Sequence, residues 1–202
     1  MTKMKFCGIK RAEDVEAVNE IKPDYIGFVF LETRKRYVNP DTASSLKKKL
    51  DPAIKAVGVF VDAPLEEVEK LLLDGTIDMA QLHGNESEEY ISELKSKTDK
   101  KIIKAFEISD GTKADDIEKC CADYVLLDSG KGTGKTFNWD LIKGIKRDFF
   151  LAGGMGTDNV KEAIEAVEPF AVDVSSGIET DGIKDKDKMA AFAAAVRGAK
   201  ND

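Results

Sequence analysis

Short apolar runs alternate with amphipathic segments along the whole chain. Eight of these runs have the length of a β-strand, and several are apolar at consecutive positions instead of at every second one. Continuous apolar runs are typical of parallel strands that are buried on both faces. The expected strands are Lys5–Gly8, Tyr25–Phe30, Ala56–Val61, Met79–Leu82, Ile102–Phe106, Tyr124–Leu127, Phe149–Ala152 and Ala171–Val174.

The segments between these runs place apolar residues at helical spacing. One full set at i, i+3, i+4 and i+7 consists of Val160, Ala163, Ile164 and Val167. A shorter stripe consists of Ile117, Cys120 and Cys121. The signals for helix starts are Pro64, the pair Asn85 and Glu88, and Asn138 before Trp139.

Strict alternation of eight strands with eight helices predicts an α/β fold, the closed (β/α)8 or TIM barrel. The alternative is an open doubly wound sheet, which carries a glycine fingerprint after its first strand. The sequence CGIKRAED at that place lacks the pattern G-x-G-x-x-G. No linker or low-complexity tract divides the chain, so we expect residues 1–202 to form a single barrel domain.

Charge and composition narrow the classes of partner. The chain has 31 Lys and Arg against 38 Asp and Glu, a formal net charge of −7. Nucleic acids and anionic membranes both favour a basic protein surface. No apolar run approaches the ~20 residues of a membrane span, and the N-terminus lacks the apolar core of a signal peptide. We therefore expect a soluble cytoplasmic protein, monomeric because its outer helix faces are charged, that acts on a small molecule.

The cysteines and the single histidine do not suggest a metal site. Cys120 and Cys121 are adjacent and Cys7 is distant, so the three cysteines provide neither a disulfide framework nor the spacing of zinc ligands. Cys120 and Cys121 are interpreted as part of a helix stripe. An odd number of cysteines favours a reducing compartment. We expect no metal.

Small residues follow the last two expected strands. Phe149–Gly156 reads FFLAGGMG and Ala171–Glu179 reads AVDVSSGIE. Small residues at a strand end let backbone N–H groups approach a ligand, and a helix N-terminus beside them adds positive potential. In (β/α)8 barrels the loops after strands seven and eight frequently bind phosphate. The sequence therefore predicts a phosphate site after strands seven and eight.

Polar residues end two of the other strands, where the catalytic groups of this fold lie. Cys7 is either a base, which requires a thiolate, or a small buried apolar residue. Asp128 is either an acid or base, with a pKa raised by the apolar core, or a cap. The two residues come from strands one and six, on different sides of the barrel mouth. A proton donor and an acceptor that flank a substrate are what an isomerase requires.

Three further polar residues belong to the same end of the barrel. The guanidinium of Arg36 suits a carboxylate, although a solvated loop charge is the simpler interpretation. His83 is interpreted as a polar wall of the pocket rather than as a base. Asp173 either holds a sugar hydroxyl or only orders the loops.

The segment Gly130–Thr136, which reads GKGTGKT, looks like a P-loop. The motif requires glycine where this chain has Ser129. In addition, the next helix begins too late for the loop to wrap a triphosphate. We interpret the segment as an active-site lid that carries Lys135 near the substrate.

Short motifs in the order of the chain resemble phosphoribosylanthranilate isomerase of tryptophan biosynthesis, over nearly the whole length. They include KFCGI (Lys5–Ile9), RYV (Arg36–Val38), GVFVD (Gly58–Asp62), QLHG (Gln81–Gly84), LLDS (Leu126–Ser129), GTGKTF (Gly132–Phe137), LAGGM (Leu151–Met155) and DVSSGIE (Asp173–Glu179). KFCGI together with DVSSGIE is highly specific, whereas LAGG is shared by many phosphate-binding barrels.

The resemblance implies an Amadori rearrangement of N-(5-phosphoribosyl)anthranilate to the 1-deoxyribulose 5-phosphate compound. No cofactor is needed, because the imine formed on ring opening is itself the electron sink. The resemblance implies that Cys7 is the general base, that Asp128 is the general acid and that Arg36 contacts the anthranilate carboxylate. The implied phosphate ligands are Gly153, Gly154, Ser175, Ser176 and Gly177.

The chain departs from the family pattern at two positions, and other functions stay open. Arg34 stands where the family usually has serine, and Asn138 stands where it often has aspartate. One alternative is another phosphate-binding barrel enzyme, of the pentose-phosphate epimerase or indole-forming synthase type. Another is a non-catalytic barrel that binds a phosphate metabolite or a partner protein, which would be expected to lack the acid or the base.

Overall fold

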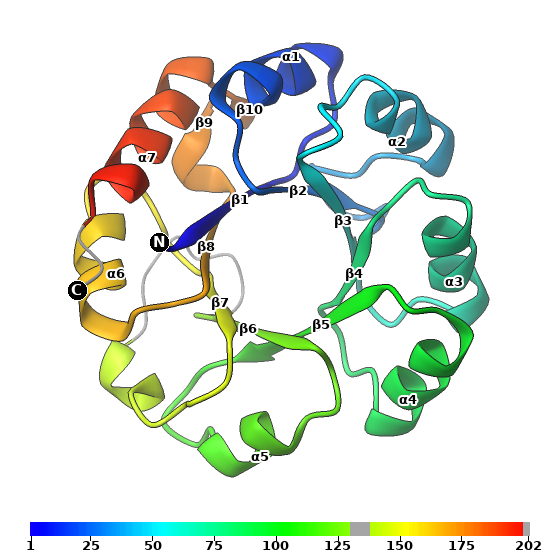
Figure 1. Cartoon of the computed structure of the whole chain (residues 1–202), viewed down its shortest axis with the longest axis vertical. Coiled ribbons are helices and arrows are strands. Elements are labelled where there is room, and N and C mark those ends of the chain that lie inside the picture. Colours follow the sequence, from blue (N-terminus) through cyan, green and yellow to red (C-terminus); the bar gives the residue numbers. More distant parts are fainter. Residues whose placement is uncertain (130–137, 200–202) are drawn as a thin grey trace.

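Eight parallel strands close into a barrel, and each strand pairs with the next along the chain until β8 pairs with β1 (Figure 1). The computed structural model describes residues 1–129 and 138–199. The strands are β1 (Lys3–Cys7), β2 (Tyr25–Val29), β3 (Lys55–Phe60), β4 (Met79–Leu82), β5 (Lys101–Glu107), β6 (Tyr124–Asp128), β7 (Phe149–Leu151) and β8 (Ala171–Val174). The predicted (β/α)8 barrel is confirmed.

Helices surround the barrel on the outside (Figure 1). They are α1 (Ala12–Ile21), α2 (Pro40–Lys47), α3 (Leu65–Leu73), α4 (Glu88–Lys97), α5 (Ala114–Lys119), α6 (Val160–Val167) and α7 (Lys186–Gly198). Between β8 and α7 lie the 3-10 helix η2 (Ser176–Ile178) and a hairpin of β9 (Glu179–Thr180) and β10 (Ile183–Lys184). No helix in the described part of the chain is long and apolar enough to cross a bilayer.

The segment after β6 differs from the expected helix. Of this segment the structure describes residues 138–148, which form η1 (Trp139–Ile142), a 3-10 turn of four residues, in place of a full helix. Asn138 caps this turn as predicted, because its side-chain oxygen accepts a hydrogen bond from the backbone N–H of Asp140 at 3.0 Å. Gly144 follows the turn closely, and glycine disfavours a longer helix at this point.

The predicted cap of α4 is wrong. Ser87 caps this helix, since its hydroxyl accepts a hydrogen bond from the backbone N–H of Tyr90 at 3.3 Å. The backbone N–H of Asn85 instead donates to Asp62 at 2.6 Å. Asn85 therefore belongs to the loop that joins β4 to α4.

The expected helical stripe through Cys120 and Cys121 is also wrong. The helix α5 ends at Lys119, and Cys120 leaves the helical conformation with ψ of 131°. The backbone N–H of Cys121 donates to the Glu88 carboxylate at 2.9 Å, which draws this segment toward α4. Cys120 is nevertheless buried in the shell between helices and barrel.

Aromatic rings fill the barrel near the N-terminal ends of the strands. The fully buried ring of Phe150 meets those of Tyr25, Tyr124 and Phe170 edge-on, with centroids 5.4, 5.8 and 5.6 Å away. The ammonium of Lys3 lies 4.7 Å from the centroid of Phe170. Because these side chains occupy this end of the barrel, ligands have access only from the C-terminal ends of the strands.

Replacing Phe150 with alanine should lower the free energy of unfolding by about 3–5 kcal/mol, since it leaves a cavity among rings that cannot collapse into it. Urea denaturation monitored by circular dichroism measures the loss. Leu73→Ala is the control, because Leu73 is 61% exposed and its truncation should change stability by about 0.5 kcal/mol or less. Equal losses in the two variants would contradict this account of the core.

Candidate active site

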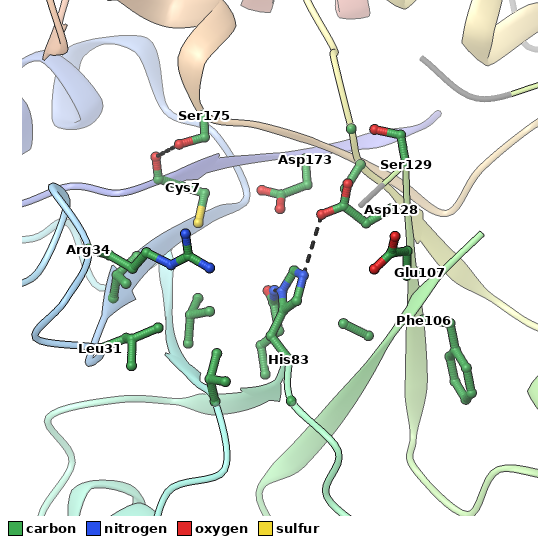
Figure 2. Close-up of a pocket in the computed structure, with 18 of the residues that line it drawn as sticks. Cys7, Leu31, Arg34, His83, Phe106, Glu107, Asp128, Ser129, Asp173 and Ser175 are labelled. Atoms are coloured by element: carbon green, nitrogen blue, oxygen red, sulfur yellow. Dashed lines mark hydrogen bonds and ion pairs between the residues drawn. The ribbon is translucent and has the colours of Figure 1, made fainter. Parts of the chain in front are cut away.

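A cavity of about 810 Å³ opens at the C-terminal ends of the strands. Its lining includes most of the residues that the sequence analysis singled out, namely Cys7, Arg36, His83, Asp128, Gly153, Gly154, Asp173, Ser175 and Ser176. Gly177 is not part of the lining but packs against Met155, which is, and Lys135 lies outside the described residues. Figure 2 shows the thiol of Cys7 and the carboxylate of Asp128 on opposite sides of this space.

Cys7 is the last residue of β1, and contacts on both sides fix its backbone. The next residue, Gly8, has φ of +85°, and a Cβ at this position would lie 2.5 Å from the Cδ of Arg36. Glycine therefore permits both the turn and the passage of the arginine side chain. The hydroxyl of Ser175 donates to the carbonyl oxygen of Cys7 at 3.1 Å and ties β1 to the loop after β8 (Figure 2).

A buried ion pair lies beside the thiol. The side chain of Lys5 is fully buried, and its Nζ is 3.0 Å from Oδ1 of Asp173. Gly27 on β2 makes room for this group, because a Cβ there would lie 2.8 Å from the sulfur of Cys7 and 3.3 Å from Nζ of Lys5. The ammonium and the thiol therefore share one small space in the barrel wall.

Burial and charge act on the thiol in opposite directions. Burial raises the pKa of Cys7, and the charges of Lys5 and Lys184 lower it without cancelling the effect of burial. Burial also disfavours the ammonium of Lys5, but attraction to Asp173 and Cys7 outweighs it and raises the pKa of Lys5. Lys5 therefore stays protonated near neutral pH and is available to stabilise a thiolate.

Asp128 is the last residue of β6, and it faces His83, which follows β4. Nε2 of His83 lies 3.4 Å from Oδ2 of Asp128 (Figure 2). The amide nitrogen of Gln81 lies 2.8 Å from Nδ1 of His83 and only donates, so Nδ1 accepts. A neutral imidazole then carries its proton on Nε2, which faces the carboxylate. His83 thus forms a polar side of the cavity and directs an N–H group toward Asp128.

Arg36 belongs to a charged cluster and is not simply a solvated loop charge. Its Nε and Nη2 donate to the two carboxylate oxygens of Glu179, both at 2.7 Å. Lys184 contacts the same carboxylate at 2.7 Å and donates to the carbonyl oxygen of Ser175 at 2.9 Å. Burial would raise the pKa of Glu179, but the hydrogen bonds from Arg36 and Lys184 outweigh it and lower the pKa to about 2. This cluster joins the loop after β2 to the loop after β8.

The loops after β7 and β8 present backbone donors to the cavity. Gly153 and Gly154 have φ of +88° and +62°, which favour glycine. Among the described residues, the backbone N–H groups of Gly153, Gly154 and Ser175 find no acceptor. A Cβ at Gly177 would collide with the carbonyl oxygen of Met155, so glycine lets the two loops pack together. Backbone N–H groups without a partner among the described residues, on two loops that line one cavity, suit an anion such as phosphate.

Sequence reasoning missed several charged groups of this site. Lys104 stands inside an expected apolar strand and Lys5 begins one, and these exceptions to the apolar pattern were the available signal. Lys104 pairs with Glu86 at 2.8 Å, and both line the cavity. Glu179 and Lys184 lie in the hairpin of β9 and β10, beyond the last strand of the barrel, where no local pattern marks them as partners. Within the described part of the chain, no group of three or more His, Cys, Asp or Glu side chains is arranged to hold a metal ion.

The chain is similar to proteins of one family over nearly its whole length. Residues 4–195 match the family described as N-(5'-phosphoribosyl)anthranilate (PRA) isomerase. The N-(5'-phosphoribosyl)anthranilate isomerase of Clostridium acetobutylicum is 45% identical, with 98% of each chain covered.

Solved structures agree with this similarity. A phosphoribosyl anthranilate isomerase in complex with reduced 1-(o-carboxyphenylamino)-1-deoxyribulose 5-phosphate is 35% identical, with a TM-score of 0.86. Mutually generated monomers of the dimeric enzyme from Thermotoga maritima are 33% identical, also with a TM-score of 0.86. In both comparisons, 98% of this chain and all of the other chain are covered.

Replacing Glu179 with glutamine should destabilise the protein by about 3–5 kcal/mol at pH 7, because the buried ammonium of Lys184 and the guanidinium of Arg36 lose their counter-charge. The folded-state pKa of Glu179 is about 2 against an ordinary 4.5, so its carboxylate stabilises the fold fully above that ordinary pKa. This stabilisation is lost as the pH falls toward 2.

Urea denaturation at pH 7 and at about pH 3 measures the effect. The difference in free energy of unfolding between wild type and variant should be smaller at the lower pH. Glu165→Gln is the matched control, because Glu165 forms an exposed pair with Lys161. An equal difference in free energy of unfolding at both pH values would contradict the assigned role of the Glu179 carboxylate.

Proposed function

This chain belongs to the N-(5'-phosphoribosyl)anthranilate isomerase family and is an isomerase of tryptophan biosynthesis, and from that premise we propose how its residues carry the reaction. The substrate is N-(5'-phosphoribosyl)anthranilate, and the product is 1-(o-carboxyphenylamino)-1-deoxyribulose 5-phosphate. One observation carries the assignment of roles: Cys7 and Asp128 face one cavity from opposite sides, beside two loops with free N–H groups. A base and an acid on either side of an anchored sugar are what this rearrangement needs.

Asp128 acts first, as the general acid. Its protonated carboxyl group gives a proton to the ring oxygen of the ribose, and the bond between that oxygen and C1 breaks. The lone pair of the anthranilate nitrogen forms a C=N bond with C1, so ring opening leaves a hydroxyl group on C4 and a protonated imine. The N–H group of His83 faces the carboxylate that remains and stabilises it.

Cys7 then acts as the general base. Its thiolate removes the proton from C2, the C–H electron pair forms a C1=C2 bond, and the C=N electrons return to nitrogen. The resulting enolamine becomes the product when its C2 hydroxyl loses a proton to form the ketone and C1 gains a proton. The ammonium of Lys5 stabilises the thiolate that begins this step.

The phosphate anchor and the sugar contacts complete the proposal. The backbone donors around Gly153, Gly154 and Ser175 hold the phosphate, and Ser176 and Gly177 continue the same loop. Oδ1 of Asp173 is held by Lys5, so Oδ2 is left to accept a hydrogen bond from a ribose hydroxyl. Anchoring both ends of the sugar keeps C2 beside the sulfur, which lowers the entropic part of the barrier.

We further propose that the enzyme acts as a cytoplasmic, single-domain monomer. Cys7, Cys120 and Cys121 are all free, which suits a reducing compartment. In the described part of the chain, the exposed large hydrophobic side chains are Met1, Leu73, Leu141 and Ile183. Met1 precedes β1, and the other three lie in α3, η1 and β10. Their separation along the chain favours a monomer over a protein with an apolar interface.

Cys7→Ala and Asp128→Asn should each lower kcat by about 10²–10⁴-fold, because each removes one of the two proton-transfer groups. Steady-state assays that follow the loss of substrate fluorescence measure the effect. The urea midpoint and the affinity for the reduced product analogue should stay close to wild type. A near-wild-type kcat in either variant would remove the role assigned to that residue.

Lys5→Met should move the acid limb of the kcat/KM profile to higher pH, because the ammonium of Lys5 lowers the pKa of Cys7 and its loss leaves only the charge of Lys184 to oppose the effect of burial. The pH dependence of Cys7 alkylation, followed by peptide mass spectrometry, should shift in the same direction. Lys3→Met is the control and should leave both profiles unchanged, since Lys3 lies at the end of β1 opposite Cys7.

The variant Lys5→Met leaves Asp173 buried without a partner, so the double variant Lys5→Met with Asp173→Asn tests the fold separately. If the single variant folds and its alkylation profile matches that of wild type, Lys5 does not tune the thiol.

A further inference from the structure

Two buried charged residues at the edge of the cavity have no role in the reaction steps proposed above. The side chain of Glu86 is 1% exposed and that of Lys104 is 10% exposed, and Nζ of Lys104 lies 2.8 Å from Oε2 of Glu86. Glu86 lies in the loop between β4 and α4, Lys104 lies on β5, and both line the cavity. Burying two charges requires further compensating contacts, so the other partners of this pair indicate what it does.

The ion pair holds the backbone that follows His83. The N–H group of Gly84 donates to both carboxylate oxygens of Glu86, at 3.2 and 2.9 Å. Nζ of Lys104 donates to the carbonyl oxygen of Gly84 at 2.6 Å. Both backbone polar groups of Gly84 are therefore bound by the pair. The peptide bond that joins His83 to Gly84 cannot turn without the loss of a charge-assisted hydrogen bond.

The carboxylate of Glu86 also ties this loop to the loop after β3. Its Oε1 accepts a hydrogen bond from the backbone N–H of Asp62 at 2.9 Å, and Oδ1 of Asp62 accepts from the backbone N–H of Asn85 at 2.6 Å. Asp62 has φ of +49°, which is uncommon for residues other than glycine, and these contacts hold it there. A Cβ at Gly84 would collide with Asp62, so glycine lets the two loops meet.

The exact position of His83 matters because its contact with Asp128 is long. Nε2 of His83 lies 3.4 Å from Oδ2 of Asp128 (Figure 2). An N–H···O hydrogen bond usually spans about 2.9–3.0 Å, so an outward shift of about half an ångström would remove this contact. Gln81 determines which ring nitrogen carries the proton, because it contacts Nδ1. The place of the ring depends in addition on the backbone of the loop.

We propose that the ion pair of Lys104 and Glu86 positions His83 to stabilise the carboxylate that forms when Asp128 gives its proton to the substrate. The proposal rests on the proposed function, because it concerns a step assigned there. In this role neither Lys104 nor Glu86 contacts the reacting atoms, so both are positioning residues. The contact with His83 strengthens as negative charge develops on Asp128. Loss of the pair should therefore lower kcat and kcat/KM equally and leave KM nearly unchanged.

The test is a mutant cycle between the ion pair and His83. The double variant Lys104→Met with Glu86→Gln removes the pair, leaves neither charge buried alone and keeps an oxygen that can accept hydrogen bonds from the loop backbone. His83→Ala removes the group that the pair is proposed to position. Steady-state assays give kcat and KM for wild type, for each of these variants and for their combination, and urea denaturation checks that each protein is folded.

Removal of the pair should lower kcat by about tenfold, the range of one charge-assisted hydrogen bond, and should change KM by less than about twofold. The combined variant should be no slower than His83→Ala alone, because the pair acts through His83. Lys101→Met is the matched control, since Lys101 pairs with Asp123 at 2.9 Å and begins the same strand at its end opposite the cavity. It should leave kcat at the wild-type value.

A spectroscopic measurement follows the same contact directly. His83 is the only histidine of the chain, so the nitrogen-15 NMR spectrum of histidine-labelled protein reports on this ring alone. Removal of the pair should move the ring resonances toward their positions in Asp128→Asn, because both changes remove the contact between ring and carboxylate. Lys101→Met should leave the resonances at their wild-type positions.

An unchanged kcat on removal of the pair, unmoved ring resonances, or an equal loss of kcat with and without His83 would overturn the proposal. If the double variant does not fold, Glu86→Asp replaces it in the cycle. This variant keeps both charges but withdraws the carboxylate by one methylene group, and its loss of kcat should also vanish in the His83→Ala background. A wild type that does not isomerise N-(5'-phosphoribosyl)anthranilate would instead contradict the proposed function.

Discussion

The active end of this barrel depends on how the fold balances the charges that it buries around Cys7. Lys5 is fully buried and is neutralised by Asp173 at 3.0 Å, while Glu179 is neutralised by Arg36 and Lys184 together. An ion buried without a partner costs several kcal/mol, so each group here requires the others. The same balance leaves one ammonium beside the thiol, where it opposes the effect of burial on the cysteine pKa.

These ion pairs also decide the shape of the cavity. The Glu179 cluster holds the loop after β2 against the loop after β8, and Lys184 donates directly to Ser175 within the second of these loops. Charged side chains therefore support the backbone that we propose to bind the phosphate. Such bracing keeps the free N–H groups oriented before a ligand arrives, which reduces the cost of binding.

The two ends of the barrel have different roles, although the same eight strands form both. At the N-terminal ends, aromatic rings around Phe150 fill the interior and carry stability. At the C-terminal ends, the strands finish in Cys7, Asp128 and small residues, and the cavity opens there. Stability and chemistry are thus separated in space, so a residue such as Arg34 can differ from the family pattern without disturbing the core.

The pattern of residues was enough to predict the barrel, because eight apolar runs that alternate with helical segments admit few other arrangements. The motifs around Cys7, Asp128 and DVSSGIE indicated where the site lies. Local signals were weaker where neighbours compete: Asn85 bonds to Asp62 instead of capping α4, and the helix after β6 shortens to η1. The folded structure was needed to show that Lys5 pairs with Asp173, 168 residues away, and that Arg36 pairs with Glu179, 143 residues away. Such pairings depend on which side chains the closed barrel brings together, and no local pattern of residues encodes that geometry.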